Sequence, residues 1–104
     1  EHGVDVMDVS TGGIMSGVSI PVKPNYQVPF SEQVKAKADI PVTAVGLITK
    51  PKQAAKILAH GEADAVEIGR AALRDPYWPL RAANKLGIPS TEIPYAPQYV
   101  AGAY

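Results

Sequence analysis

The sequence contains no cysteine, which excludes disulfide bonds and thiolate metal sites. Such a composition is compatible with a reducing compartment, and we expect a cytoplasmic location. The chain also lacks an excess of either charge, because ten basic residues balance ten acidic ones. We therefore expect neither nucleic acid nor an anionic membrane surface as a partner. No apolar run approaches the ~20 residues that a membrane-spanning helix needs.

The first residues show neither the charged and apolar segments of a signal peptide nor an initiator methionine. Gly3 is typical of a residue that ends a helix, so we expect that helix to lie mostly upstream of Glu1. His2 and His60 both lie beside glycines at expected helix ends, where the helix dipole favours a cation. No metal-ligand spacing connects them, and we expect neither histidine to be catalytic.

Short apolar and β-branched segments alternate along the chain with segments of helical periodicity. The expected strands cover 4–10, 41–48 and 65–68. The expected helices begin at Ser31 as N-cap, at Thr49 and Pro51, and at Asp75 as N-cap with Pro76 in the first helical position. Residues 14–29 are predicted to be a long loop, and 88–104 an irregular tail.

This order of elements predicts right-handed βαβ units and a parallel sheet. A (β/α)8 barrel needs about 250 residues, so a chain of 104 holds about three of its eight units. An open three-stranded sheet would leave two long edges unpaired. We therefore predict an α/β fold in which 1–87 form the last three βα units of a (β/α)8 TIM barrel. The remainder of the barrel would lie upstream, and 88–104 would be a C-terminal tail on the barrel or at a dimer interface.

Two strand ends carry the residue types that phosphate recognition uses. Gly69 and Arg70 follow the third strand, and Gly46 follows the second. Glycine lets a ligand approach the backbone closely, and arginine supplies a permanent planar cation. In barrels the loops after strands seven and eight commonly form a phosphate site. The spacing alone equally allows glycines that only relieve crowding beside a surface arginine.

Other polar residues have a simpler structural interpretation. Ser10, at the end of the first strand, could line a ligand site, but we favour Ser10 and Thr11 as groups that satisfy turn backbone. For Asp75 we favour the N-cap over a catalytic role. The sequence has no paired carboxylates, no Ser-His-Asp arrangement and no Gly-x-Gly-x-x-Gly motif, so no reaction chemistry is visible in it.

Five segments, in order, resemble the old yellow enzyme family, and in particular its bacterial thermophilic-like branch of NADPH-dependent ene-reductases. These segments are VMDVSTG at 6–12, YQVPF at 26–30, AVGLIT at 44–49, IGRAALRDP at 68–76 and PQY at 97–99. They extend over nearly the whole chain, and the segment at 68–76 is the most specific. The resemblance implies an FMN-binding (β/α)8 barrel of which this chain is roughly the last third.

The resemblance also implies roles for individual residues. Gly69 and Arg70 match the pair that holds the FMN phosphate after the eighth strand. Gly46 matches a backbone donor to the same phosphate, and Ser10 lies near the flavin. The implied cofactors are FMN and NADPH, and the implied substrate is a small activated alkene. The tyrosine that donates a proton and the histidine pair or His/Asn that binds the carbonyl oxygen would lie upstream, so no catalytic residue is assigned in this chain.

The tail resembles a segment that crosses a dimer interface and helps to close the neighbouring active site, which implies a homo-oligomer. Some members of the family have an arginine shortly after the Gln-Tyr pair, whereas this chain has VAGAY at 100–104. Any contribution to the neighbouring site would therefore come from an aromatic such as Tyr104 or from the backbone.

Two other functions are open at this point. One is a different phosphate-binding barrel enzyme, such as a sugar-phosphate isomerase or an aldolase, which would share strand-end glycines by analogy of fold. The other is a non-enzymatic interaction module that binds partners through its tail of prolines and tyrosines. A flavin spectrum would distinguish the first from an ene-reductase, and cooperative unfolding of 1–104 alone would support the second.

Overall fold

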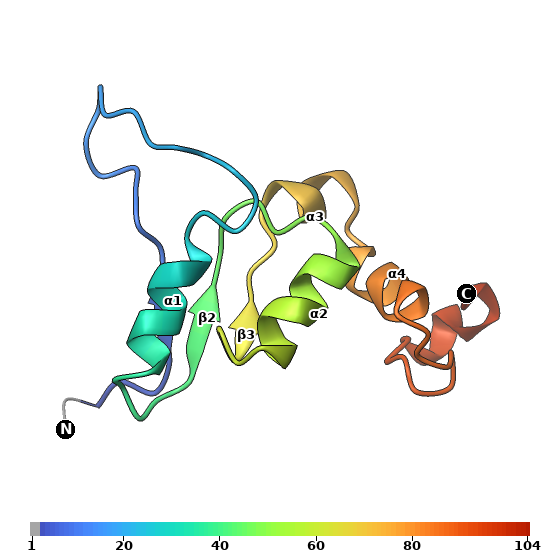
Figure 1. Ribbon diagram of the computed structural model, residues 1–104. Helices are drawn as coiled ribbons and strands as arrows, with labels where there is room; N and C mark the ends of the chain where they lie inside the picture. The colour runs from blue at the N-terminus through green and yellow to red at the C-terminus, as the bar shows by residue number, and fades with distance from the viewer. Residues whose placement is uncertain (1–2) are drawn as a thin grey trace.

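A three-stranded parallel sheet is the centre of the fold (Figure 1). The computed structural model describes residues 3–104. The strands lie in the order β1 (Met7–Val9), β2 (Val42–Ala44), β3 (Ala65–Val66). The register pairs Val9 with Ala44 and Ala44 with Val66. The predicted α/β organisation with a parallel sheet is confirmed, although each strand is shorter than its apolar segment.

Helices cover the sheet on one side and continue toward the C-terminus. They are α1 (Val28–Lys35), α2 (Pro51–Ala59), α3 (Arg70–Arg74) and α4 (Trp78–Lys85), followed by the 3-10 helix η1 (Pro97–Gly102). Buried side chains of α1, β2 and α2 form one core cluster, so these two helices cover the same face of the sheet. No helix in the described part of the chain is long and apolar enough to cross a membrane.

The first helix begins earlier than predicted, and the expectation that Ser31 caps it is wrong. Pro29 lies in the first turn of α1, where its fixed φ suits a helix start. Ser31 is fully buried inside the helix. Its hydroxyl lies 2.8 Å from the carbonyl oxygen of Val28 and 3.1 Å from that of Glu62. It thus connects α1 to the backbone that precedes β3.

The expected cap at Asp75 is also wrong. A short helix, α3, precedes Asp75, which is its C-cap, and α4 begins only at Trp78 with Pro79 in its first turn. The Asp75 carboxylate instead accepts hydrogen bonds from the Arg81 guanidinium in an ion pair. The structural interpretation of Asp75 therefore stands with a different partner. The helix α3 has five residues, too few for its periodicity to be visible in the sequence.

The second helix follows the prediction. Helix α2 begins at Pro51, and Gly61 and Gly87 have φ of +71° and +83° just after α2 and α4. Gly3 has a φ of +72°. The helix that it was expected to end, and the expectation for His2, lie outside the described residues.

At the amino end of the sheet, Asp64 connects three elements. Its carboxylate accepts a hydrogen bond from Lys35 Nζ of α1 at 2.7 Å and one from the backbone N–H of Val42 in β2 at 2.9 Å. The hydrogen bond from Lys35, and after it the bond from Val42, lower the pKa of Asp64 below its ordinary value of 3.8. These bonds hold α1 and β2 beside the start of β3.

This geometry predicts a pH-dependent contribution to stability. Because the pKa of Asp64 is lower in the folded protein, its contribution is fully present above the unfolded value of 3.8 and is lost as the pH falls through the folded value. The stability difference between wild type and Asp64→Asn, measured by urea unfolding of the full-length protein, should be largest at neutral pH and shrink below 3.8. Lys35→Met should move that loss to higher pH. A difference that does not change with pH would contradict the assignment.

Candidate functional site

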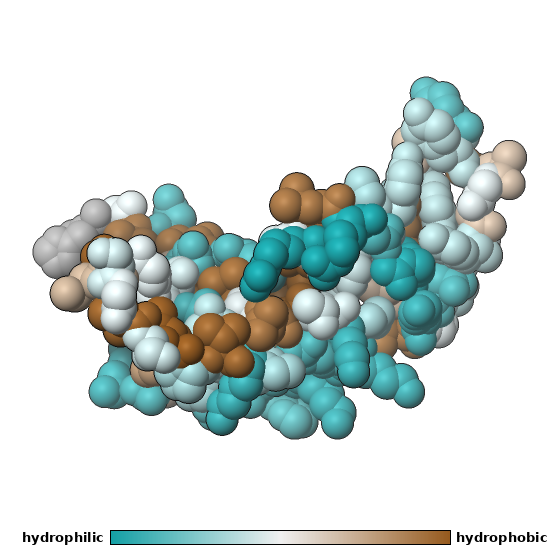
Figure 2. All heavy atoms as spheres, turned by 90° about the horizontal axis from the view of Figure 1, so that it is seen from above, coloured by the Kyte–Doolittle hydropathy of each residue, from teal (hydrophilic) through white to brown (hydrophobic). Residues whose placement is uncertain are grey.

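A cavity of about 370 Å³ lies at the carboxyl ends of the strands. It is lined by Ser10, Tyr26, Gln27, residues 45–49, Glu67, residues 69–71 and Arg74. All four residues that the sequence singled out, Ser10, Gly46, Gly69 and Arg70, are among them. Figure 2 looks onto this end of the sheet and shows strongly hydrophilic atoms beside hydrophobic ones. Residues from three strand ends therefore meet in one place, as parallel strands require.

Positive charge at this cavity comes from two arginines. Arg70 and Arg74, at the two ends of α3, both line the cavity and are exposed. Within residues 3–104, neither guanidinium takes part in an ion pair. Both cations are therefore available to an anion. The sequence interpretation did not include Arg74 in the site, because the next two residues were taken as a helix start.

Backbone donors also line the cavity. Gly46 and Leu47 follow β2 with φ of +115° and +51°, and Gly69 follows β3. Across the described residues, the N–H groups of these three residues have no hydrogen-bond acceptor. Unpaired backbone N–H groups usually find a partner in water or a ligand. The wall of the cavity thus combines fixed donors with the arginine side chains.

Gly46 is a position at which the structure strongly favours glycine. A Cβ placed on it would lie 2.7 Å from Nε2 of Gln27 and 2.8 Å from Cε1 of Tyr26. Its φ of +115° also belongs to a region that other residues rarely adopt. The strand-end glycine therefore lets the chain turn beneath two packed side chains.

Gln27 contributes most to the architecture of the cavity among the residues that sequence reasoning missed. It is 4% exposed. Its Oε1 accepts hydrogen bonds from the N–H and the hydroxyl of Thr11, and its Nε2 donates to the carbonyl oxygen of Val45 at 3.4 Å. It thereby connects the loops after β1 and β2. The only signal in the sequence was its place in the segment at 26–30.

We expected Ser10 and Thr11 only to satisfy turn backbone, but the two residues have different surroundings. Thr11 makes the hydrogen bonds to Gln27 just described, and so has a structural role. Ser10 lines the cavity and is exposed. Ser10 therefore stays a candidate binding residue, whereas Thr11 holds the loop.

The carboxylates Glu67 and Asp8 near the strand ends make contacts within the sheet. Thr43 donates its hydroxyl hydrogen to Oε1 of Glu67 at 2.5 Å and lies 3.5 Å from Oδ1 of Asp8. No group of three or more His, Cys, Asp or Glu in the described range 3–104 is arranged to hold a metal ion. These side chains connect neighbouring strands in the sheet.

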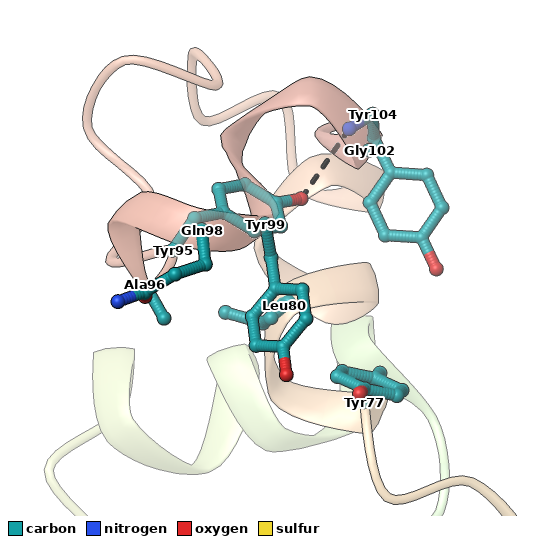
Figure 3. A pocket seen from close by; sticks show the side chains of 8 residues that line it. All are labelled: Tyr77, Leu80, Tyr95, Ala96, Gln98, Tyr99, Gly102 and Tyr104. Carbon is teal, nitrogen blue, oxygen red and sulfur yellow. Dashed lines mark hydrogen bonds between the residues drawn. The ribbon is translucent and has the colours of Figure 1, made fainter.

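A second cavity of about 540 Å³ lies between α4 and the tail (Figure 3). Its lining residues are Tyr77, Leu80, Tyr95, Ala96, Gln98, Tyr99, Gly102 and Tyr104. Figure 3 shows the hydrogen bond from the N–H of Tyr104 to the hydroxyl of Tyr95, at 3.4 Å, which closes the tail on itself. The tail is therefore folded around η1, although much of its aromatic surface is exposed.

Comparison with known proteins identifies the family. Residues 1–88 match the model of the NADH:flavin oxidoreductase / NADH oxidase family. The chain belongs to this family. The resemblance to the old yellow enzyme family that the sequence indicated is therefore confirmed. The family match supports FMN as the cofactor, and the names of the curated relatives below support NADPH. The family has the TIM-barrel fold.

The chain is also similar in sequence to curated NADPH dehydrogenases. The NADPH dehydrogenase of Geobacillus thermodenitrificans (strain NG80-2) is 51% identical over 88 residues, or 85% of this chain and 26% of the relative. That of Geobacillus sp. (strain WCH70) is 48% identical over 102 residues, or 98% and 29%. That of Bacillus licheniformis is 49% identical over 86 residues, or 83% and 25%. The chain thus spans little more than a quarter of the length of these relatives.

The geometry at Gly46 generates a prediction for stability. Gly46→Ala should lower the free energy of unfolding by about 1–3 kcal/mol, because the strained φ is then adopted by a residue with a Cβ that meets Gln27. Urea unfolding of the full-length protein measures this change. Gly102→Ala is the matched control, since its added Cβ would meet nothing within 4 Å. Equal stability of the two variants would contradict the strain at Gly46.

Proposed function

We propose that this chain is part of an FMN-dependent NADPH oxidoreductase and that it supplies the phosphate end of the flavin site. The observation that carries the proposal is the cavity where Ser10, Gly46, Gly69 and Arg70 meet. Membership of the flavin oxidoreductase family supports FMN over another phosphate ligand. This argues against a sugar-phosphate isomerase or an aldolase.

The residues of the cavity suit a phosphate monoester. The Arg70 guanidinium can form charge-assisted hydrogen bonds to two phosphate oxygens. The N–H groups of Gly46, Leu47 and Gly69 lack acceptors among residues 3–104 and can supply further donors. Glu67 is the one carboxylate in the lining, and the two arginines outweigh its charge.

The chemistry that FMN supplies when bound is hydride transfer, here between NADPH and an activated alkene. We propose that the protein is an ene-reductase and that this chain binds and orients the cofactor. The proton donor and the groups that bind the substrate carbonyl would come from the preceding part of the polypeptide. The residues described here would therefore affect cofactor retention more than the proton-transfer step.

We also propose that the sheet continues into the rest of a (β/α)8 barrel, with 1–87 as its last three units. The exposed apolar residues at the free edge strand support this. Val4, Val6 and Met7 are 50%, 52% and 42% exposed although they lie in or beside β1. A neighbouring strand that pairs with β1 would cover them and remove the open edge. The non-enzymatic module is disfavoured for the same reason.

For residues 88–104 we propose contact with a second copy of the protein. Tyr99, Val100 and Tyr104 are 64%, 58% and 56% exposed, and they follow the buried Ile93 that anchors the tail. Aromatic residues of this kind are common in protein interfaces. Tyr104 would be the side chain available to the neighbouring active site.

The phosphate assignment predicts weaker flavin binding when the cation is removed. Arg70→Ala in the full-length protein should weaken FMN binding by about 1.5–3 kcal/mol, the usual cost of losing a hydrogen bond to a charged group. Fluorescence of released FMN measures the dissociation constant. Lys56→Ala removes one positive charge from the exposed face of α2, outside the cavity, and should leave FMN binding unchanged. Equal FMN affinity of Arg70→Ala and wild type would contradict the assignment.

The reaction class has its own test. The full-length protein, purified yellow with bound flavin, should oxidise NADPH faster when an α,β-unsaturated ketone is added under anaerobic conditions. Product analysis should find the saturated ketone. If NADPH is oxidised only with oxygen, the protein is a flavin oxidoreductase but not an ene-reductase.

A further inference from the structure

The cavity wall after β2 is built from an unfavourable backbone turn. Gly46 and Leu47 are consecutive residues with positive φ, and Leu47 is not a glycine. A left-handed leucine persists only where its surroundings hold it. The N–H groups of Gly46 and Leu47 have no hydrogen-bond acceptor within residues 3–104, so they do not stabilise the turn. The hydrogen bonds that hold the turn are accepted by the carbonyl groups of Val45 and Leu47.

Gln53, in the first turn of α2, provides that support from one side. Its Nε2 donates to the carbonyl oxygen of Leu47 at 2.8 Å and to Oδ1 of Asn25 at 2.5 Å. Its Oε1 accepts from the N–H groups of Thr49 and Lys50 at 3.0 and 3.3 Å. One side chain therefore both caps α2 and holds the turn.

Gln27 supports the turn from the other side. Its Nε2 donates to the carbonyl oxygen of Val45, just before Gly46, while its Oε1 is occupied by Thr11. The carbonyls on either side of the Gly46–Leu47 peptide unit are thus both held by glutamine amides. Unlike Gln27, Gln53 lies outside the cavity lining, so it acts only through the turn.

We propose that Gln53 is a positioning residue for phosphate binding, and that its amide N–H group keeps the Gly46–Leu47 turn in the conformation that presents backbone donors to the anion. This rests on the proposed function of the cavity. The residue type is restricted because both halves of the amide are used. Glutamate would still accept from Thr49 and Lys50 but could not donate to Leu47, and methionine could do neither.

This difference between side chains defines the experiment. Apoprotein of the full-length wild type, Gln53→Glu, Gln53→Met and Arg70→Ala is titrated with FMN and with riboflavin, which lacks the phosphate. Loss of the hydrogen bond to Leu47 predicts that both Gln53 variants bind FMN about 3- to 10-fold more weakly. Their riboflavin affinity should stay within about twofold, because no phosphate contact is lost. Gln53→Met should lower the melting temperature more than Gln53→Glu does, because only methionine also loses the cap of α2.

Matched controls are Gln33→Glu and Gln33→Met on the exposed part of α1, where the glutamine makes no side-chain hydrogen bond to any residue in 3–104. They should leave the ratio of FMN to riboflavin affinity as in wild type. Weakening in Gln53→Glu alone would be a charge effect and would overturn the proposal. So would an unchanged ratio in both Gln53 variants while Arg70→Ala lowers it. If the wild type binds riboflavin as tightly as FMN, or if Arg70→Ala keeps the wild-type ratio, the phosphate site itself is wrong.

Discussion

The parallel pairing of β2 with both of its neighbours is the constraint on which the rest of the structure depends. Val42 and Ala44 are completely buried, because strands flank β2 on both edges and helices cover one face. Because the strands are parallel, the carboxyl ends of all three lie at the same end of the sheet. Residues about 60 positions apart, such as Ser10 and Arg70, can therefore line one cavity. If neighbouring strands were antiparallel, the residues that follow them would lie at opposite ends of the sheet.

The two ends of this sheet have different tasks. At the amino end, the Asp64 carboxylate accepts hydrogen bonds from the Val42 N–H and from Lys35, so these polar groups are paired within the protein. At the carboxyl end, the N–H groups of Gly46 and Leu47 and the Arg70 guanidinium lack partners among residues 3–104. The first end holds the elements together, and the second leaves its donors available.

The strands, their parallel order and the meeting of Ser10, Gly46, Gly69 and Arg70 at one cavity could be predicted, because parallel strands bring their carboxyl ends together. The role of these four residues in phosphate binding stays a proposal, since strand-end glycines also relieve crowding. Helix starts at Ser31 and Asp75 were wrong, since proline two or more positions away decides where each helix begins. Helix α3 is too short for a periodic pattern. The roles of Gln27 and Gln53 depend on contacts with loops distant in sequence, and a polar residue gives no sign of such partners before the chain folds.

Ser31 has a consequence for how this protein can vary. Its side chain has no exposed surface, and its hydroxyl lies against two backbone carbonyls from different parts of the chain. Alanine would fit the space but remove the hydroxyl donor, and threonine would add a methyl group to a closely packed site. Substitutions accepted at this position by drift should therefore be few, although it lies in a helix of otherwise ordinary composition. We expect sequence differences among close relatives to be rare at Ser31 and more frequent on the exposed side of α1.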